Sequence, residues 1–118
     1  MNFDKHNSRW LLIFTPNTSN EDYAEQHRLL RNHETGFEER DLTTVLVSET
    51  SDGSITPDES AEAHSKYGVE DGGFAVVLLG KDGTEKFRSG EPVSANELFE
   101  RIDAMPMRRR EIRERSGG

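Results

Sequence analysis

Two short, uninterrupted apolar runs constrain the fold of this chain more than any other feature of its sequence. They are residues 10–14 (WLLIF) and residues 74–79 (FAVVLL). Both have the length of a β-strand, and a strand that is apolar at every position is covered on both faces of its sheet. We therefore expect a sheet with helices packed on each side.

Two capping boxes predict where helices begin. Thr56 is followed by Pro57 and, three residues after the cap, by Glu59, which is a typical helix N-terminus. Ser94 and Glu97 repeat the spacing. These signals predict helices over residues 57–67 and 95–105, ended by Gly68 and by Pro106.

A further helix is indicated after the first apolar run. A side chain within residues 18–20 would cap it, and Tyr23, Leu30 and Phe37 are spaced by seven, so that they would share one face. This spacing predicts one helix that begins near residue 21 and continues toward Phe37.

The order of elements follows once two more strands are added. Residues 42–49 are rich in Thr and Val, and residues 84–89 follow a tight turn. The predicted order is β-α-β-α-β-β-α, an α/β fold with a four-stranded mixed sheet. Strand–helix–strand units favour parallel pairing, and the late hairpin adds an antiparallel edge. The expected divisions are a loose segment over residues 1–8, a domain over residues 9–106 and an Arg-rich tail over residues 107–118.

Composition excludes several kinds of chemistry. The 118 residues are the length of one domain, and none of them is cysteine. Disulfides, thiolate nucleophiles and zinc–thiolate sites are therefore excluded, and no motif indicates a cofactor. The net charge is −8, which disfavours loose binding to nucleic acid or to anionic membranes.

The sequence also bears on cellular location. No apolar run approaches the ~20 residues of a membrane span, and residues 1–6 do not resemble a signal peptide. We expect a cytoplasmic protein from the chain as written, or a secreted or periplasmic one if a signal peptide has been removed.

Several segments together resemble one family. They are LLIFTP at residues 11–16, ERDL at 39–42, YGV at 67–69, GFAVVLLGKDG at 73–83 and IDAMPMRR at 102–109. These segments resemble a peroxiredoxin-like or thioredoxin-like domain of unknown function, which occurs in small bacterial proteins and in secreted animal coiled-coil and sushi-repeat proteins. The resemblance covers roughly residues 9–112. It implies a thioredoxin-like fold and no established activity.

The chain departs from redox-active proteins of that fold at two places. Their active cysteine follows the first strand, where residues 15–23 here hold only hydroxyls, amides, carboxylates and one phenol. A cis-proline, or in peroxiredoxins an Arg, usually precedes their third strand. In this chain the nearest residues to that position are Gly73, Phe74 and Ala75.

The loop after the first strand is the first candidate site. Ligands of open α/β sheets usually bind where strands end, and a helix N-terminus there favours anions. A serine nucleophile would also need a nearby histidine base, which the spacing does not reveal. Plain helix capping is the simpler interpretation. The candidate residues are Thr15, Asn17, Thr18, Ser19 and Asn20.

The histidines and acidic pairs offer no metal-site pattern. His27 and His33 are six residues apart and would lie on different sides of one helix, while His6 and His64 lie elsewhere. No two histidines have the i, i+4 spacing of a helical metal pair. Acidic pairs such as residues 38–39 and 58–59 point away from one another on a helix, so we interpret them as solvated faces.

The C-terminal segment is the one region whose charge opposes the rest. Residues 108–115 contain five Arg and two Glu, a balance of +3, so the remaining residues sum to −11. Arg108, Arg109, Arg110 and Arg113 are candidates for contact with an acidic partner or nucleic acid. The segment could instead dock onto its own acidic body or remain solvated, and we prefer those interpretations.

These observations favour a redox-inactive thioredoxin-like binding or scaffold domain. The alternatives are an enzyme with a non-thiol site at residues 15–20, and contact with nucleic acid or an acidic partner through the Arg-rich tail. An unidentified protein partner fits the favoured interpretation; membranes and nucleic acid do not. The sequence does not define an oligomeric state.

Overall fold

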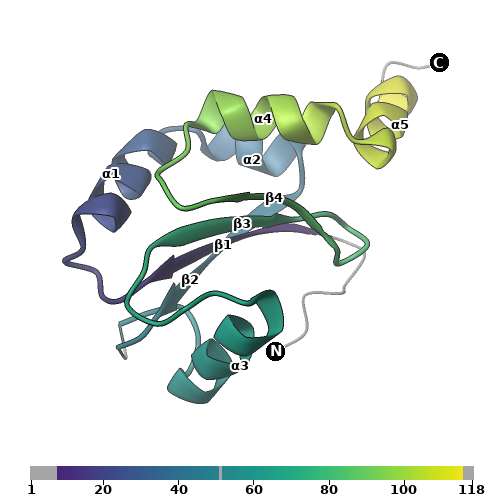
Figure 1. The fold of residues 1–118 in the computed structure, drawn as a ribbon. Helices are drawn as coiled ribbons and strands as arrows, with labels where there is room; N and C mark the ends of the chain where they lie inside the picture. Colours follow the sequence, from purple (N-terminus) through teal and green to yellow (C-terminus); the bar gives the residue numbers. More distant parts are fainter. Residues whose placement is uncertain (1–7, 51, 116–118) are drawn as a thin grey trace.

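A single four-stranded sheet organises the molecule (Figure 1). The computed structural model describes residues 8–50 and 52–115. The strands lie in the order β2-β1-β3-β4. Their bounds are β1 (Arg9–Thr15), β2 (Leu42–Ser48), β3 (Ala75–Leu79) and β4 (Glu85–Ser89).

Helices cover both faces of this sheet, as the sequence predicts (Figure 1). Helices α1, α2 and α4 lie over one face, α3 lies over the other, and α5 continues beyond the end of α4. The bounds of the helices are α1 (Glu21–Leu30), α2 (Glu34–Glu39), α3 (Pro57–Tyr67), α4 (Ala95–Asp103) and α5 (Pro106–Arg115). None of the described helices is long and apolar enough to cross a membrane.

The mixed sheet is confirmed, but the direction of β3 corrects the parallel pairing expected of strand–helix–strand units. β1 pairs in parallel with β2, whereas β3 runs antiparallel to β1 and β4 antiparallel to β3. Glu49, just after β2, accepts a hydrogen bond from the Gly72 N–H at 2.7 Å. Residues 68–74 thus bring the chain back to the end of the sheet at which β2 finished. β3 starts from that end and must therefore run in the opposite direction to β2.

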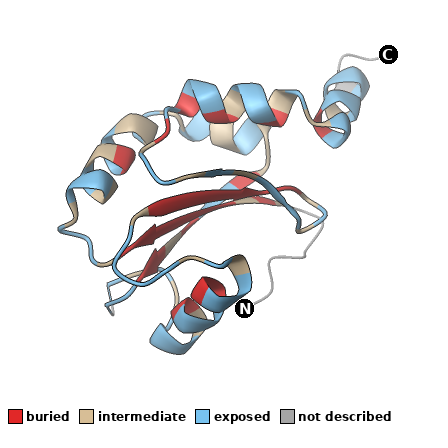
Figure 2. Cartoon of the chain, in the orientation of Figure 1, coloured by how far each residue is buried: buried red, intermediate tan, exposed pale blue. Residues whose placement is uncertain are grey.

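The apolar core is divided into two layers by the sheet. Leu12 and Phe14 belong to the cluster beneath α3, while Leu11 and Ile13 belong to the cluster beneath α1, α2 and α4. This alternation follows from the period of two along a strand. The central strands β1 and β3 are the buried centre of the molecule (Figure 2).

Helices α3 and α4 begin where the capping signals predict, but of the two predicted capping boxes only the first forms both of its reciprocal hydrogen bonds. Thr56 and Glu59 form a reciprocal capping box at the start of α3, and Gly68 ends that helix with a φ of 64°. At α4, Ser94 accepts a hydrogen bond from the Glu97 N–H. The Glu97 carboxylate pairs with Arg101 at 3.2 Å.

The single helix expected from residue 21 toward Phe37 is wrong. Helix α1 ends at Leu30, Asn32 adopts a left-handed φ of 70°, and α2 begins at Glu34. Tyr23, Leu30 and Phe37 nevertheless pack against the same core cluster. The spacing of seven therefore predicts correctly that the three side chains share a buried face. The prediction of one continuous helix from the same spacing is wrong.

Candidate functional site

The loop after β1 uses its polar groups on itself and on the helix that follows. The Thr15 hydroxyl is buried and donates to the Asn17 carbonyl at 2.8 Å. Asn17 Oδ1 accepts the Ser19 N–H at 2.9 Å, and Asn20 Oδ1 accepts the Tyr23 N–H at 3.1 Å. These contacts make Asn20 the cap of α1.

Thr18 contacts a second loop, which the sequence analysis did not single out. Its hydroxyl and its N–H both reach Asp52 Oδ2, at 2.7 and 3.3 Å. Ser48 donates to Asp52 Oδ1 at 2.6 Å, and the Thr50 hydroxyl donates to the same oxygen. We call Thr18, Ser48, Thr50 and Asp52 the Asp52 cluster. It joins the loops that follow β1 and β2.

The electrostatics of the Asp52 cluster limit its chemistry. Hydrogen bonds from Ser48, Thr50 and Thr18 hold the pKa of Asp52 well below its usual range. An ionised carboxylate with so low a pKa is a weak base and cannot donate a proton near neutral pH. Its negative charge also opposes anion binding at the N-terminus of α1.

The histidines lie apart from this loop cluster. His27 is on α1 and His33 precedes α2, so the placement of both on one helix is corrected. His64 is buried against the Phe14 ring, with Nδ1 2.8 Å from the Val69 carbonyl oxygen. Within residues 8–50 and 52–115, no three His, Asp or Glu side chains are grouped to hold a metal ion. His6 lies outside the described residues.

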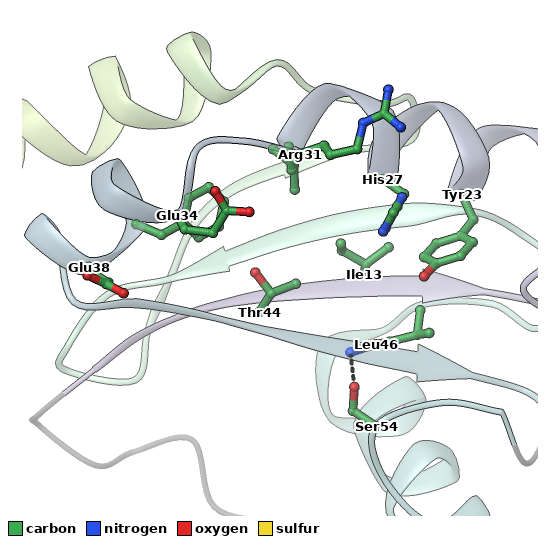
Figure 3. A pocket seen from close by; sticks show the side chains of 11 residues that line it. Ile13, Tyr23, His27, Arg31, Glu34, Glu38, Thr44, Leu46 and Ser54 are labelled. Carbon is green, nitrogen blue, oxygen red and sulfur yellow. Dashed lines mark hydrogen bonds between the residues drawn. The ribbon is translucent and has the colours of Figure 1, made fainter.

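A groove of about 440 Å³ opens between α1, α2 and the outer strand β2 (Figure 3). Its apolar lining comes from Ile13, Leu30, Phe37 and Leu46. Polar side chains stand around this lining; they belong to Tyr23, His27, Arg31, Glu34, Glu38, Thr44 and Ser54. We call this hollow the α1–α2 groove. Sequence reasoning missed it because Leu30 and Phe37 read as ordinary core residues.

The Arg-rich segment divides into docked and exposed side chains. Arg108 is buried, and it donates to the Glu39 carbonyl at 2.9 Å and to Asp103 at 3.1 Å. Arg9, fully buried at the start of β1, makes a two-point contact with Glu111 at 3.2 and 3.1 Å. The first turns of α5 are thereby fastened to the sheet domain.

Glu111 is the centre of this charged cluster. Lys81 pairs with it at 2.9 Å and with Asp41 at 2.8 Å. Burial acts to raise the pKa of Glu111, but hydrogen bonds from Arg9 and Lys81 outweigh that effect and lower the pKa to about 2. The carboxylate therefore stays ionised and paired at neutral pH.

The remaining candidate arginines face solvent. Arg109, Arg110 and Arg113 are exposed on α5. The same helix carries Met107 and Ile112, which are 43% and 39% exposed and are the large exposed apolar residues of the described chain. The structure thus separates Arg108, which is docked, from three arginines that are free to meet solvent or a partner.

Solved structures show which fold this is. The chain is similar to a reduced 2-Cys peroxiredoxin from Plasmodium vivax, with 16% identity, a TM-score of 0.67, and coverage of 91% of this chain and 82% of the other. It is also similar to thioredoxin peroxidase I from Plasmodium yoelii, with 20% identity, a TM-score of 0.67, and coverage of 91% and 78%. At these identities the likeness shows the thioredoxin-like fold alone.

Sequence comparison adds the family. No curated protein matches the chain. The family described as "Domain of unknown function (DUF4174)" matches residues 2–111, which include β1 through Glu111 of α5. This chain, which has a thioredoxin-like fold and contains no cysteine, therefore belongs to the DUF4174 family.

Proposed function

We propose that this chain is a binding or scaffold domain that works without thiol chemistry. The observation that carries the proposal is the state of the loop after β1. The sequence contains no cysteine, and the side chains of Thr15, Asn17, Thr18 and Asn20 are engaged within the loop, in the Asp52 cluster or in capping α1. Because these contacts hold the loop in place, we assign it a structural role at the carboxyl end of β1.

Enzymatic assays test this proposal directly. The purified chain should consume hydrogen peroxide with dithiothreitol, and reduce insulin disulfides, only at the rate of a blank without protein. A cysteine-containing peroxiredoxin serves as the positive control. Turnover that rises in proportion to the concentration of this chain would contradict the proposal.

A non-thiol site at the same loop needs its own test. Ester and phosphate-ester substrates should be hydrolysed no faster by the wild type than by Asp52→Asn, because a carboxylate with a strongly lowered pKa is a poor general base. Hydrolysis by the wild type that disappears in Asp52→Asn would establish the enzymatic alternative instead.

A contact surface on α5 is a second candidate function. It is supported by three exposed arginines, Arg109, Arg110 and Arg113, which lie on the same helix as the exposed Met107 and Ile112. Cations beside apolar side chains fit an acidic protein partner. No aromatic residue lies among them for base stacking, so nucleic acid is disfavoured.

The docking of Arg108 determines how this surface should be tested. Deleting residues 107–118 would also remove Arg108 and Glu111, which hold α5 to the domain. The sharper variant changes Arg109, Arg110 and Arg113 to Glu. The expected result is loss of binding to a labelled polyglutamate peptide.

A charge-matched control keeps this test specific. Changing Arg28, Lys66 and Lys86 to Glu alters the net charge by the same amount at exposed positions on other elements. This control should retain binding, and equal loss in both variants would show a general charge effect and refute the α5 surface. Binding of a single-stranded RNA in place of the peptide would favour the nucleic-acid alternative.

A further inference from the structure

The two edges of the sheet differ in their side chains. At one edge, β4 carries the exposed charged residues Glu85, Lys86 and Arg88, and its pairing with β3 has a register shift. At the other edge, β2 has the sequence LTTVLVS, without a charged residue. Charges and irregular register protect an edge against added strands, and β2 has neither protection.

Main-chain groups of β2 face outward at alternate residues. The Asp41 carbonyl accepts from Arg9, and the Glu49 N–H donates to Thr15, so odd-numbered residues face β1. Even-numbered residues face away from β1, as Leu46 confirms by bonding Ser54 on that side through both its N–H and its carbonyl.

Leu42 and Thr44 are the outward-facing residues that precede Leu46. Among the described residues, none hydrogen-bonds the main chain of either from outside the sheet. Two residues whose outward N–H and C=O groups have no partner in the described part of the chain are enough for a short antiparallel pairing of four hydrogen bonds.

The α1–α2 groove adjoins this free edge. Thr44 lines the groove, beside the apolar side chains of Phe37 and Leu46. A volume of about 440 Å³ exceeds the space of one aromatic side chain. A strand added at Thr44 would therefore have a place for a large apolar residue.

The charged groups around the groove favour a basic partner. Glu34 and Glu38 are exposed and one turn apart on α2, and neither forms an ion pair with a described residue. Both lie at the end of the groove where β2 begins, whereas the Arg31 guanidinium points away from the groove (Figure 3).

We propose that an extended peptide adds to the outer edge of β2 as an antiparallel strand. The peptide residue opposite Thr44 shares its face, so an aromatic side chain there enters the groove. Two residues later the peptide lies opposite Leu42, where a Lys or Arg meets Glu34 and Glu38. This inference rests on the proposed binding function and names its surface and class of partner.

Fluorescence anisotropy of a labelled hexapeptide, Thr-Trp-Thr-Lys-Thr-Val with blocked ends, tests the proposal on the full chain, because no residue of this peptide lies opposite Leu46, where Ser54 occupies the strand edge. We expect saturable binding. Replacing the peptide Lys by Glu should weaken binding about tenfold, because attraction to Glu34 and Glu38 becomes repulsion. N-methylation of the Trp amide should weaken binding at least about tenfold, since it removes a strand-pairing donor while keeping every side chain.

Two neighbouring threonines provide matched protein variants. Thr43 and Thr44 are both exposed on β2, but their side chains point to opposite faces of the sheet. Thr44→Lys places a cation in the groove and should abolish binding of the Lys peptide. Thr43→Lys, on the face of α3, should leave binding within about twofold, and circular dichroism should show both variants folded.

Four results would overturn the proposal. They are absence of saturable binding by the hexapeptide, equal binding of the N-methylated peptide, binding of tryptamine as tight as that of the hexapeptide, and a dimer in sedimentation that the hexapeptide does not dissociate. The last two would assign the groove to a small amine or to a second copy of the chain. None of these results alters the peroxide and disulfide assays, so the proposed function stands or falls separately.

Discussion

Asp52 connects the ends of β1 and β2 through the hydrogen bonds of one carboxylate. Its carboxylate accepts from Ser48 at the end of β2 and from Thr18 in the loop after β1, which is 34 residues away in sequence. Removing the carboxylate should loosen both loops at once.

The stability contributed by Asp52 should depend on pH in a defined direction. The folded pKa is lowered, so the contribution is fully present above the unfolded pKa of about 3.9 and declines as pH falls through the folded pKa. Asp52→Asn should therefore unfold at lower urea than the wild type at pH 7, and the difference should shrink below about pH 4. A difference that stays constant down to pH 2.5 would contradict this account of Asp52.

Glu111 should matter more, because it neutralises a fully buried cation. Glu111→Gln removes the one carboxylate that the described residues place against the Arg9 guanidinium, which we expect to cost about 2–3 kcal/mol in the free energy of unfolding. The exposed Glu114→Gln on the same helix is the control and should change stability by less than about 0.5 kcal/mol. Equal effects in urea denaturation would show that Arg9 does not depend on Glu111.

Among the elements, the break between α1 and α2 requires a left-handed backbone conformation at residue 32, which favours Asn or Gly there. Asn32 has a φ of 70°, a conformation that Asn and Gly tolerate better than other residues. Asn32→Ala should destabilise the domain by about 1 kcal/mol, whereas Asn32→Gly should be close to neutral. Thermal unfolding of the two variants distinguishes them, and a stabilised Asn32→Ala would indicate that the helices can merge.

What could be predicted from the sequence depends on how local each signal is. The Thr56 capping box, the Gly68 cap and the buried strands rest on neighbouring residues, and all three are present in the structure. The direction of β3 depends instead on where residues 68–74 return to the sheet, which no local pattern encodes. The break at Asn32 could not be predicted from the apolar pattern, because the apolar side chains of α1 and α2 pack against the same core cluster.

The candidate sites follow the same division. Residue types within one turn predict a cap of α1 among residues 18–20, and the structure assigns that cap to Asn20. The Asp52 cluster and the α1–α2 groove each need segments that are distant in sequence, so a single sequence could not reveal them. Arg108 appeared only as one of a run of arginines, because its contact with Glu39 spans 69 positions.

At the scale of the whole molecule, the charged cluster connects the two ends of the described chain. Arg9 begins β1 and Glu111 lies in α5, 102 positions later, while Lys81 adds the turn between β3 and β4. A cluster that joins three distant segments should make α5 part of the cooperative folding unit. We therefore expect the folded domain to extend to about Glu111, where the family match also ends.

Truncation variants test this extension. A chain that ends after Pro106 loses both Arg108 and Glu111, and with Glu111 the ion pair that the described residues give the buried Arg9, so its free energy of unfolding should fall by about 3 kcal/mol or more. A chain that ends after Arg113 keeps the cluster and should unfold within about 0.5 kcal/mol of the full chain. Urea denaturation followed by Trp10 fluorescence measures both, since Trp10 lies beside Arg9 in β1. If both truncated chains matched the full chain, α5 would be a tail that touches the domain without stabilising it, and the pairing of Arg9 would have to be supplied from elsewhere.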